Sequence, residues 1–236
     1  MSKTIAVIGA GAGLGQAVAR RFGREGFGVA LVARTEAKVT ALADELRAEG
    51  IDAAAFACDV ADRVALKRTI AAITERFGRI DVVEFAPTGL DWMGRVTSAV
   101  ELTVESLEYL LDLLVRAPIE LFGAVLPDML ARGDGALLMG TGGSASVAYP
   151  QMSNIGIAMA AARSYLLNLN AALADTGVYA GLLQVGGGIA GSDAIREYGK
   201  NAVPGALIDP ADLAQTYWDM YIKRDRFDEF VAPAPN

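Results

Sequence analysis

The sequence predicts an α/β protein: a doubly wound parallel sheet of about seven strands with helices on both faces. Three observations support this fold class. Short apolar runs alternate along the chain with longer stretches of helical periodicity. A glycine-rich turn follows the first apolar run, and no internal repeat, linker or low-complexity tract interrupts the alternation. Buried parallel strands joined by covering helices produce this pattern.

The amino-terminal half alternates four strands with three helices. We expect strands at residues 5–8, 27–32, 52–58 and 80–85, and helices after the first strand, at 36–49 and at 63–77. The apolar residues of the second helix recur with the spacing of one helical face. Gly50 and Gly78 follow helices at the position where a glycine cap is common. Residues 87–99 then read as a loop.

The carboxyl-terminal half continues with longer helices. We expect helices at 104–131 (with Pro118 inside it), 152–174 and 210–224, and strands at 136–139, 178–185 and 227–231. Asp209 is the expected N-cap of the last helix, with a proline at its first position. Residues 141–150 read as a loop. We expect one domain over 1–236, with a substrate lid around 188–208.

Composition excludes several classes of function. The 236 residues carry a net charge of −7, which gives no basic surface for nucleic acid. The chain contains no histidine, so histidine acid–base catalysis and histidine metal sites are excluded, and we expect no metal. Cys58 is the single cysteine and no apolar run is long enough to span a membrane. With Lys3 followed directly by a strand, we expect no signal peptide and a cytoplasmic protein.

Four glycines follow the first strand, at positions 9, 11, 13 and 15. Glycine allows a sharp turn and a close approach of the backbone to a pyrophosphate, which the amino-terminal end of the next helix then binds. A plain structural turn needs fewer glycines. The end of the second strand carries Arg34 instead of a carboxylate, and a guanidinium suits a phosphate. NADP(H) is therefore favoured over NAD(H), although Arg34 can also be read as a surface arginine.

In this order the chain resembles the short-chain dehydrogenase/reductase family over essentially its full length. The matching segments are Gly9-x-x-x-Gly13-x-Gly15, Cys58-Asp59-Val60, Ala117-Pro118, Pro127-Asp128-Met129, Tyr149-Pro150 and Ala160-Ala161-Ala162-Arg163-Ser164. The resemblance implies a Rossmann-like fold, a homodimer or homotetramer, and a small-molecule substrate. It implies cofactor contacts from Gly9, Gly13, Leu14, Gly15, Asp59, Val60 and Ala86. Asp59 has an alternative reading as the N-cap of the following helix.

The catalytic half departs from the family. An ungapped alignment places the family's tyrosine, lysine, serine and asparagine on Ile155, Met159, Gly142 and Leu114. None of these side chains can deliver a proton. Possible replacement donors near the expected nicotinamide are Ser144, Ser146, Tyr149, Ser153 and Asn154. Of these we single out Ser144 and Tyr149, in the predicted loop after the fifth strand.

Three functions fit this combination. The first is an atypical NADP(H)-dependent oxidoreductase, for which an iminium substrate needs no proton because it already carries the charge that hydride addition neutralises. The second is a catalytically silent NADP(H)-binding sensor or partner subunit, and the third is an isomerase or cyclase on the same fold. Glu84 and Asp91 are weaker donor candidates, and Glu84 reads more simply as a charge near a sheet end.

Overall fold

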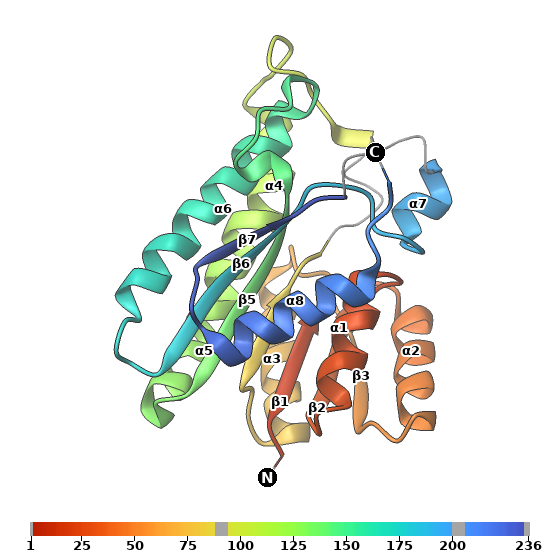
Figure 1. The fold of residues 1–236 in the computed structure, drawn as a ribbon, viewed down its shortest axis with the longest axis vertical. Helices are drawn as coiled ribbons and strands as arrows, with labels where there is room; N and C mark the ends of the chain where they lie inside the picture. Colours follow the sequence, from red (N-terminus) through yellow and green to blue (C-terminus); the bar gives the residue numbers. More distant parts are fainter. Residues whose placement is uncertain (1, 88–93, 200–205, 234–236) are drawn as a thin grey trace.

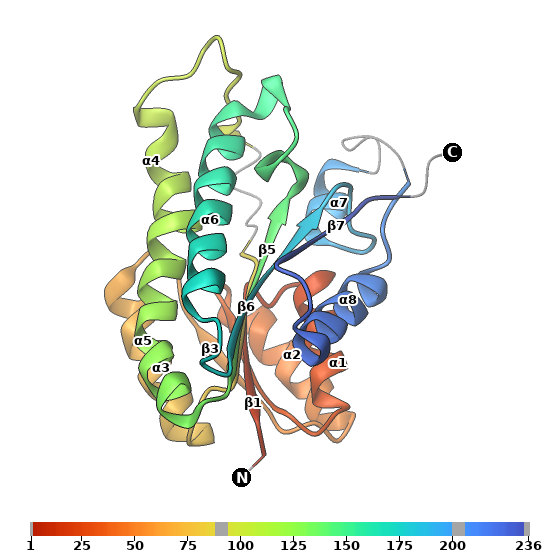
Figure 2. The same cartoon turned by 60° about the vertical axis from the view of Figure 1, so that its left-hand side comes forward.

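The computed structural model describes residues 2–87, 94–199 and 206–233, and its central layer is a single parallel sheet. The strand order is β3-β2-β1-β4-β5-β6-β7, and all six neighbouring pairs are parallel. Figures 1 and 2 show helices on both sides of this sheet. The predicted doubly wound α/β fold is confirmed. The chain winds outward from β1 to β3, returns to β4 and winds outward again to β7, so the topological switch lies between β1 and β4.

The strands are short and mostly apolar, as expected for a sheet covered on both faces. They are β1 (Thr4–Ile8), β2 (Gly28–Ala33), β3 (Ala53–Ala57), β4 (Val82–Phe85), β5 (Gly135–Gly142), β6 (Val178–Val185) and β7 (Asp228–Val231). The predicted end of β5 was too early. Thr141 and Gly142 pair with Gln184 and Val185 of β6, so backbone pairing carries the strand to residue 142.

Two apolar clusters hold the helices against the sheet. One face packs against α1 (Leu14–Gly23), α2 (Glu36–Ala48) and α8 (Pro210–Lys223), and the other against α3 (Arg63–Phe77), α5 (Ala117–Arg132) and α6 (Ser153–Ala172). Strand alternation divides the side chains between them: Ile5 and Val7 of β1 belong to the first cluster, whereas Ala6 and Ile8 belong to the second. Both faces of β1 are therefore buried, which explains its unbroken apolar sequence.

The long helix predicted at 104–131 is interrupted by a wider turn. It consists of α4 (Glu105–Leu111), a π-helical segment η2 (Asp112–Arg116) and α5. Pro118 lies in the first turn of α5, where its missing N–H and fixed φ are tolerated. Single π turns inside α-helices often occur at functional sites. Leu114 lies in the middle of this one and is buried.

The helix N-caps test two predictions from the sequence, one for Asp209 and one for Asp59. Asp209 accepts a hydrogen bond from the Ala211 N–H at 2.8 Å, which confirms it as the N-cap of α8. The N-cap of α3 is Asp62, which accepts from Val64 and Ala65. The reading of Asp59 as the helix cap is therefore wrong. Its carboxylate accepts from the Ala61 N–H at 3.0 Å and shapes the turn before the helix.

The segment predicted as a lid is partly helical. A short helix, α7 (Asp193–Tyr198), begins after Ser192, and a bridge pairs Ile189 with Ile208. Residues 200–205 lie outside the described part of the chain, as does Asp91. Movement of this segment as a lid stays a prediction.

Candidate functional site

The glycine turn (residues 9–15) joins β1 to α1 and is shaped by close backbone contacts. Gly9 and Gly13 have φ values of +100° and +97°, which disfavour any side chain. A Cβ on Gly9 would lie 2.7 Å from Pro87 Cα, and one on Gly15 would lie 2.8 Å from the Gly9 oxygen. Gly13 is the N-cap of α1 and has no side chain to occupy the first N–H groups of the helix. This backbone suits an anion.

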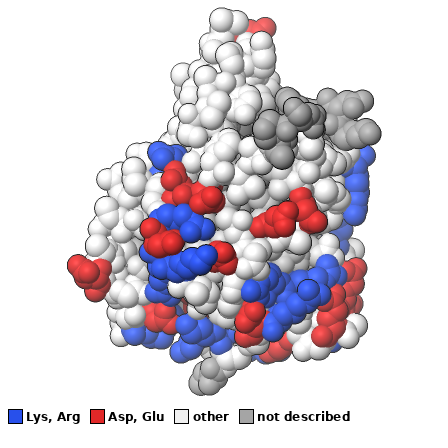
Figure 3. All heavy atoms as spheres, viewed as in Figure 1, with Lys and Arg blue, Asp and Glu red and all other residues white. Residues whose placement is uncertain are grey.

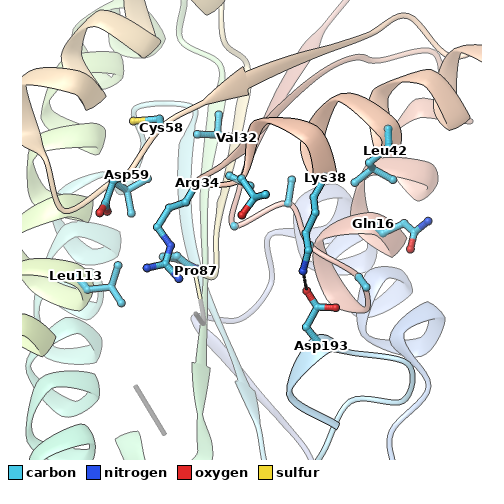
Figure 4. Close-up of a pocket in the computed structure, with 18 of the residues that line it drawn as sticks. Gln16, Val32, Arg34, Lys38, Leu42, Cys58, Asp59, Pro87, Leu113 and Asp193 are labelled. Carbon is cyan, nitrogen blue, oxygen red and sulfur yellow. Dashed lines mark hydrogen bonds and ion pairs between the residues drawn. The ribbon is translucent and has the colours of Figure 1, made fainter. Parts of the chain in front are cut away.

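A pocket of about 580 Å³ opens over the glycine turn and the carboxyl ends of β2 and β3 (Figure 4). Its lining comes from the glycine turn and α1, from the end of β2 and α2, from the turn after β3, from Pro87 after β4, from α4 and η2, and from α7. The lining residues include Gly9, Gln16, Arg34, Thr35, Lys38, Cys58, Asp59, Val60, Pro87, Leu113, Asp193 and Arg196. The pocket therefore lies at the topological switch, the usual ligand site of doubly wound sheets.

Cationic side chains enter this pocket from the end of β2 and from the first turn of α2. Figure 4 shows Arg34 extending into it from the residue that follows β2. Lys38 Nζ forms an ion pair with Asp193 Oδ2 at 3.0 Å, so α2 and α7 are joined across the pocket. Arg196, on α7, also lines it. The sequence predicted Arg34 as a binding residue but not Lys38. Lys38 lies four positions later, on α2, and lines the same pocket.

The remaining predicted cofactor contacts lie around the same pocket or its floor. Asp59 is exposed and Val60 is buried, both in the turn after β3. The Ala86 N–H donates to the Ile8 oxygen at 3.0 Å and continues the β1–β4 pairing beyond Phe85. Leu14 starts α1 and is buried. Burial raises the pKa of the Cys58 thiol, which keeps this lining residue uncharged at neutral pH.

A second group of predicted residues meets at the end of β5. Met159 Sδ accepts hydrogen bonds from the Gly142 N–H and from the Ser144 hydroxyl, both at 3.2 Å. Ile155 lies one turn earlier on α6, with 1% of its surface exposed. The structure thus brings Gly142, Ser144 and Met159 into direct contact. A thioether is a weak acceptor, so the Ser144 hydroxyl is held only weakly.

Tyr149 lies away from this group. Its side chain is exposed, in the segment before α6 where the Ala99 N–H donates to the Pro150 oxygen. Among the residues that the structure describes, no hydrogen bond joins Tyr149 to Ser144. The structure therefore places one of the two predicted donors beside Met159 and leaves the other at the exposed end of the loop.

Asn154, a possible donor from the sequence, is buried and its side chain is fully engaged by the protein itself. Its amide oxygen accepts from the Thr97 and Ile155 N–H groups at 3.0 Å, and its amide nitrogen donates to the Arg95 and Ser106 oxygens at 2.7 and 3.2 Å. One side chain thereby ties the segment before α4 to the start of α6. The partners on that segment lie about 50 residues or more away in the sequence, so no local pattern could predict the contact.

Glu84 is the third residue of β4 and does lie near the carboxyl end of the sheet. It is fully buried, however, and burial raises its pKa to about 8. Burial therefore disfavours the charged form that the sequence led us to expect.

Within residues 2–87, 94–199 and 206–233, no cluster of three or more acidic or cysteine side chains is arranged to hold a metal ion. No helix in these ranges is long and apolar enough to cross a membrane. In Figure 3 most of the acidic and basic side chains lie in the middle and lower parts of the face, where red and blue groups adjoin one another.

Comparison with known proteins assigns the family. The model described as short chain dehydrogenase matches residues 3–197. A short chain dehydrogenase of Pseudocercospora fijiensis is 30% identical over 184 residues, which are 78% of this chain but only 59% of that protein.

Solved structures agree on the fold. A metagenomic short-chain oxidoreductase in complex with NADP superposes with a TM-score of 0.80 at 22% identity, covering 100% of this chain and 99% of that one. A variant of the actinorhodin polyketide ketoreductase with NADPH gives 0.84 at 21% identity, covering 98% and 95%. The family model spans most of the described sheet, from β1 through α7, and includes the glycine turn. This chain belongs to the short-chain dehydrogenase family.

Proposed function

We propose that the protein is an NADP(H)-dependent oxidoreductase that acts on a small organic substrate without the tyrosine–lysine pair usual in its family. The observation that carries the proposal is the glycine turn beside a pocket whose lining includes three basic side chains, Arg34, Lys38 and Arg196, together with the acidic Glu45, Asp59 and Asp193. A Cβ on Gly9 would lie 2.7 Å from Pro87 Cα and one on Gly15 would lie 2.8 Å from the Gly9 oxygen, so the turn keeps its shape only with glycine at these positions. Arg34 and Lys38 line the same pocket. Structural neighbours bound to NADP and NADPH support the choice of nucleotide.

Each contact in the proposed complex has a physical reason. Gly9, Gly13, Leu14 and Gly15 hold the pyrophosphate at the start of α1, where the helix dipole favours an anion. Arg34 binds the phosphate on the adenosine ribose with its planar fork. Asp59 and Val60 contact the adenine, and Ala86 borders the nicotinamide half. The nicotinamide dinucleotide supplies a hydride when bound, and the protein's own residues position the acceptor.

The substrate side of the pocket constrains the acceptor. We propose that Ile155, Met159, Gly142 and Leu114 occupy the places of the family's catalytic residues, and none of these side chains can donate a proton. The Ser144 hydroxyl contacts Met159 and is the donor that we propose, since a hydrogen bond to a thioether is easily exchanged for one to a substrate. General acid catalysis contributes roughly 10²–10⁴-fold, so simple ketones should react slowly. A cationic iminium needs no proton and suits this site.

A second function is favoured by the same contact. Met159 Sδ accepts from both the Gly142 N–H and the Ser144 hydroxyl, so both donors are already engaged where we propose that a substrate would bind. A catalytically silent NADP(H)-binding sensor or partner subunit fits this arrangement. An isomerase or cyclase on the same fold is a third proposal, which no contact favours specifically.

The experiment has two stages. NADPH and NADH are first titrated while nicotinamide fluorescence is followed, and the proposal requires tighter binding of NADPH. The bound protein is then mixed with matched imine, enone and ketone substrates, with Ser144→Ala tested beside the exposed control Ser164→Ala. Turnover of imines that is insensitive to both substitutions supports the oxidoreductase. Binding without any turnover favours the sensor, and absence of binding by either nucleotide contradicts both.

We also propose a homodimer or homotetramer built on α5 and α6. The large apolar side chains Ile119, Leu130, Ile157 and Leu167 of these helices are exposed in the single chain. Light scattering after gel filtration measures the mass, and a monomer at micromolar concentration contradicts this part of the proposal.

A further inference from the structure

The carboxylates that line the pocket over the glycine turn have different partners. Glu45 of α2 pairs at 3.0 Å with Arg20 of α1, which lies outside the lining. Asp59 accepts a hydrogen bond from a backbone N–H in its own turn. Asp193 of α7 instead pairs with basic side chains that line the pocket themselves. Among the described residues, Asp193 is therefore the carboxylate that occupies cations available to a ligand.

The Asp193 carboxylate lies between two basic side chains. Its Oδ2 is 3.0 Å from Lys38 Nζ on α2, and its Oδ1 is 3.6 Å from Arg196 Nη1, three positions later on α7. Figure 4 shows Lys38 and Asp193 extending toward each other across the pocket. The side chains of Lys38 and Arg196 are 66% and 67% exposed, and that of Asp193 is 35% exposed. Ion pairs this exposed contribute little to folding, so their partners exchange at small cost.

The start of α2 carries Lys38 and also suits an anion. Thr35 is the N-cap of this helix, but its side chain forms no cap hydrogen bond and leaves the first N–H groups uncapped. The helix dipole favours negative charge at this end. Arg34 and Lys38 both line the pocket here, whereas Glu36, in the same turn, does not. A phosphate bound at this end of the pocket therefore competes with Asp193 for Lys38.

We propose that Asp193 is a built-in competitor for the phosphate on the adenosine ribose of NADP(H), which takes Lys38 from Asp193 when the dinucleotide binds. A phosphate monoester carries a charge of about −1.5 to −2, so it attracts the lysine more strongly than one carboxylate does. NADH has a hydroxyl in place of this phosphate. The ion pair thus sets the affinity for NADPH relative to NADH. This inference rests on the proposed function and adds Lys38 and Asp193 as residues that determine nucleotide preference.

The variant Asp193→Asn tests the competition, because the amide keeps the shape of the side chain and removes its charge. Its affinity for NADPH should rise about three- to tenfold, since no ion pair has to be broken and a like charge beside the phosphate is gone. Its affinity for NADH should change by less than about twofold. The control Asp212→Asn removes an exposed carboxylate of α8 outside the pocket lining and should leave both affinities unchanged.

A double-substitution cycle tests the exchange of partners. In wild type, binding gains the contact of Lys38 with the phosphate but loses the ion pair, so Lys38→Met removes only the difference. With Asp193→Asn already present, no pair is lost, and Lys38→Met should lower NADPH affinity by about tenfold or more. The loss in wild type should be about three- to fivefold smaller. The control Lys67→Met, on α3 and outside the lining, should have no effect in either background.

Titration of NADPH and NADH into the complete chain, followed by nicotinamide fluorescence, gives all of these affinities. Unchanged or weaker NADPH binding by Asp193→Asn, or an equal gain for both nucleotides, overturns the competition while the proposed function stands. Equal losses from Lys38→Met in both backgrounds overturn the exchange, because Lys38 then keeps Asp193 in the complex. Absence of NADPH binding by wild type contradicts the proposed function and the competition with it.

Discussion

The buried carboxyl of Glu84 should make the folded protein less stable as the pH rises. Its pKa is raised from 4.5 to about 8 in the folded chain. Between these values the folded state binds one more proton than the unfolded state, so the free energy of unfolding falls by about 1.36 kcal/mol per pH unit. The contribution is fully present below pH 4.5 and is lost as the pH approaches 8. The loss amounts to about 3 kcal/mol at neutral pH and about 5 kcal/mol at the upper end.

Glutamine has nearly the same shape and does not titrate, so Glu84→Gln isolates this effect. Urea unfolding followed by circular dichroism gives the free energy of unfolding of wild type and variant across the pH range. The difference, variant minus wild type, should grow by about 5 kcal/mol from pH 4.5 to pH 8. Other titrating groups cancel in this difference, and the exposed control Glu25→Gln should leave it flat. A Glu84→Gln difference that stays constant within about 1 kcal/mol refutes the reasoning.

Three further substitutions test the site and its supports. Arg34→Ala should weaken NADPH binding by about 10- to 150-fold, because charge-assisted hydrogen bonds are lost, and should leave NADH binding nearly unchanged. The exposed control Arg24→Ala should change the affinity for neither nucleotide. Equal losses for both nucleotides in Arg34→Ala contradict the phosphate role. Gly9→Ala should destabilise the fold by about 2 kcal/mol or more, from a positive φ and a backbone clash, while Gly11→Ala, whose Cβ meets only an oxygen at 3.9 Å, should be close to neutral in urea unfolding. Asn154→Ala should cost about 2–4 kcal/mol because it leaves several backbone groups unpaired, and an unchanged unfolding midpoint contradicts that role.

Features determined by short stretches of sequence were predictable. The apolar run of β1, the glycine turn and the cap at Asp209 each follow from neighbouring residues, and the structure confirms the fold they imply. The π segment before Pro118 was not predicted, because helical periodicity is nearly the same with or without one wider turn. The helix after Asp59 was correctly placed, but its cap is Asp62, since two aspartates precede it and only geometry separates them.

Contacts between distant parts of the chain explain what the sequence could not show. Lys38 and Asp193 are 155 positions apart, and nothing local to either indicates the pair. Glu84 stands in a strand whose other residues are apolar, and its burial depends on α8 covering the same face. The contact of Met159 with Ser144 likewise requires α6 to cross the end of β5. The sequence showed which residue types are present at the site. Which side chains contact one another there depends on how distant segments pack in the fold.

A crystal structure of the protein grown with NADPH tests the central claim most directly. The claim is that the glycine turn binds a phosphorylated dinucleotide beside a site that lacks the tyrosine–lysine pair of the family. We predict the pyrophosphate at the start of α1, the ribose phosphate on Arg34, and the Ser144 hydroxyl as the nearest side-chain donor to the nicotinamide C4. An empty pocket at saturating NADPH, or a tyrosine and a lysine converging on that carbon, would contradict it.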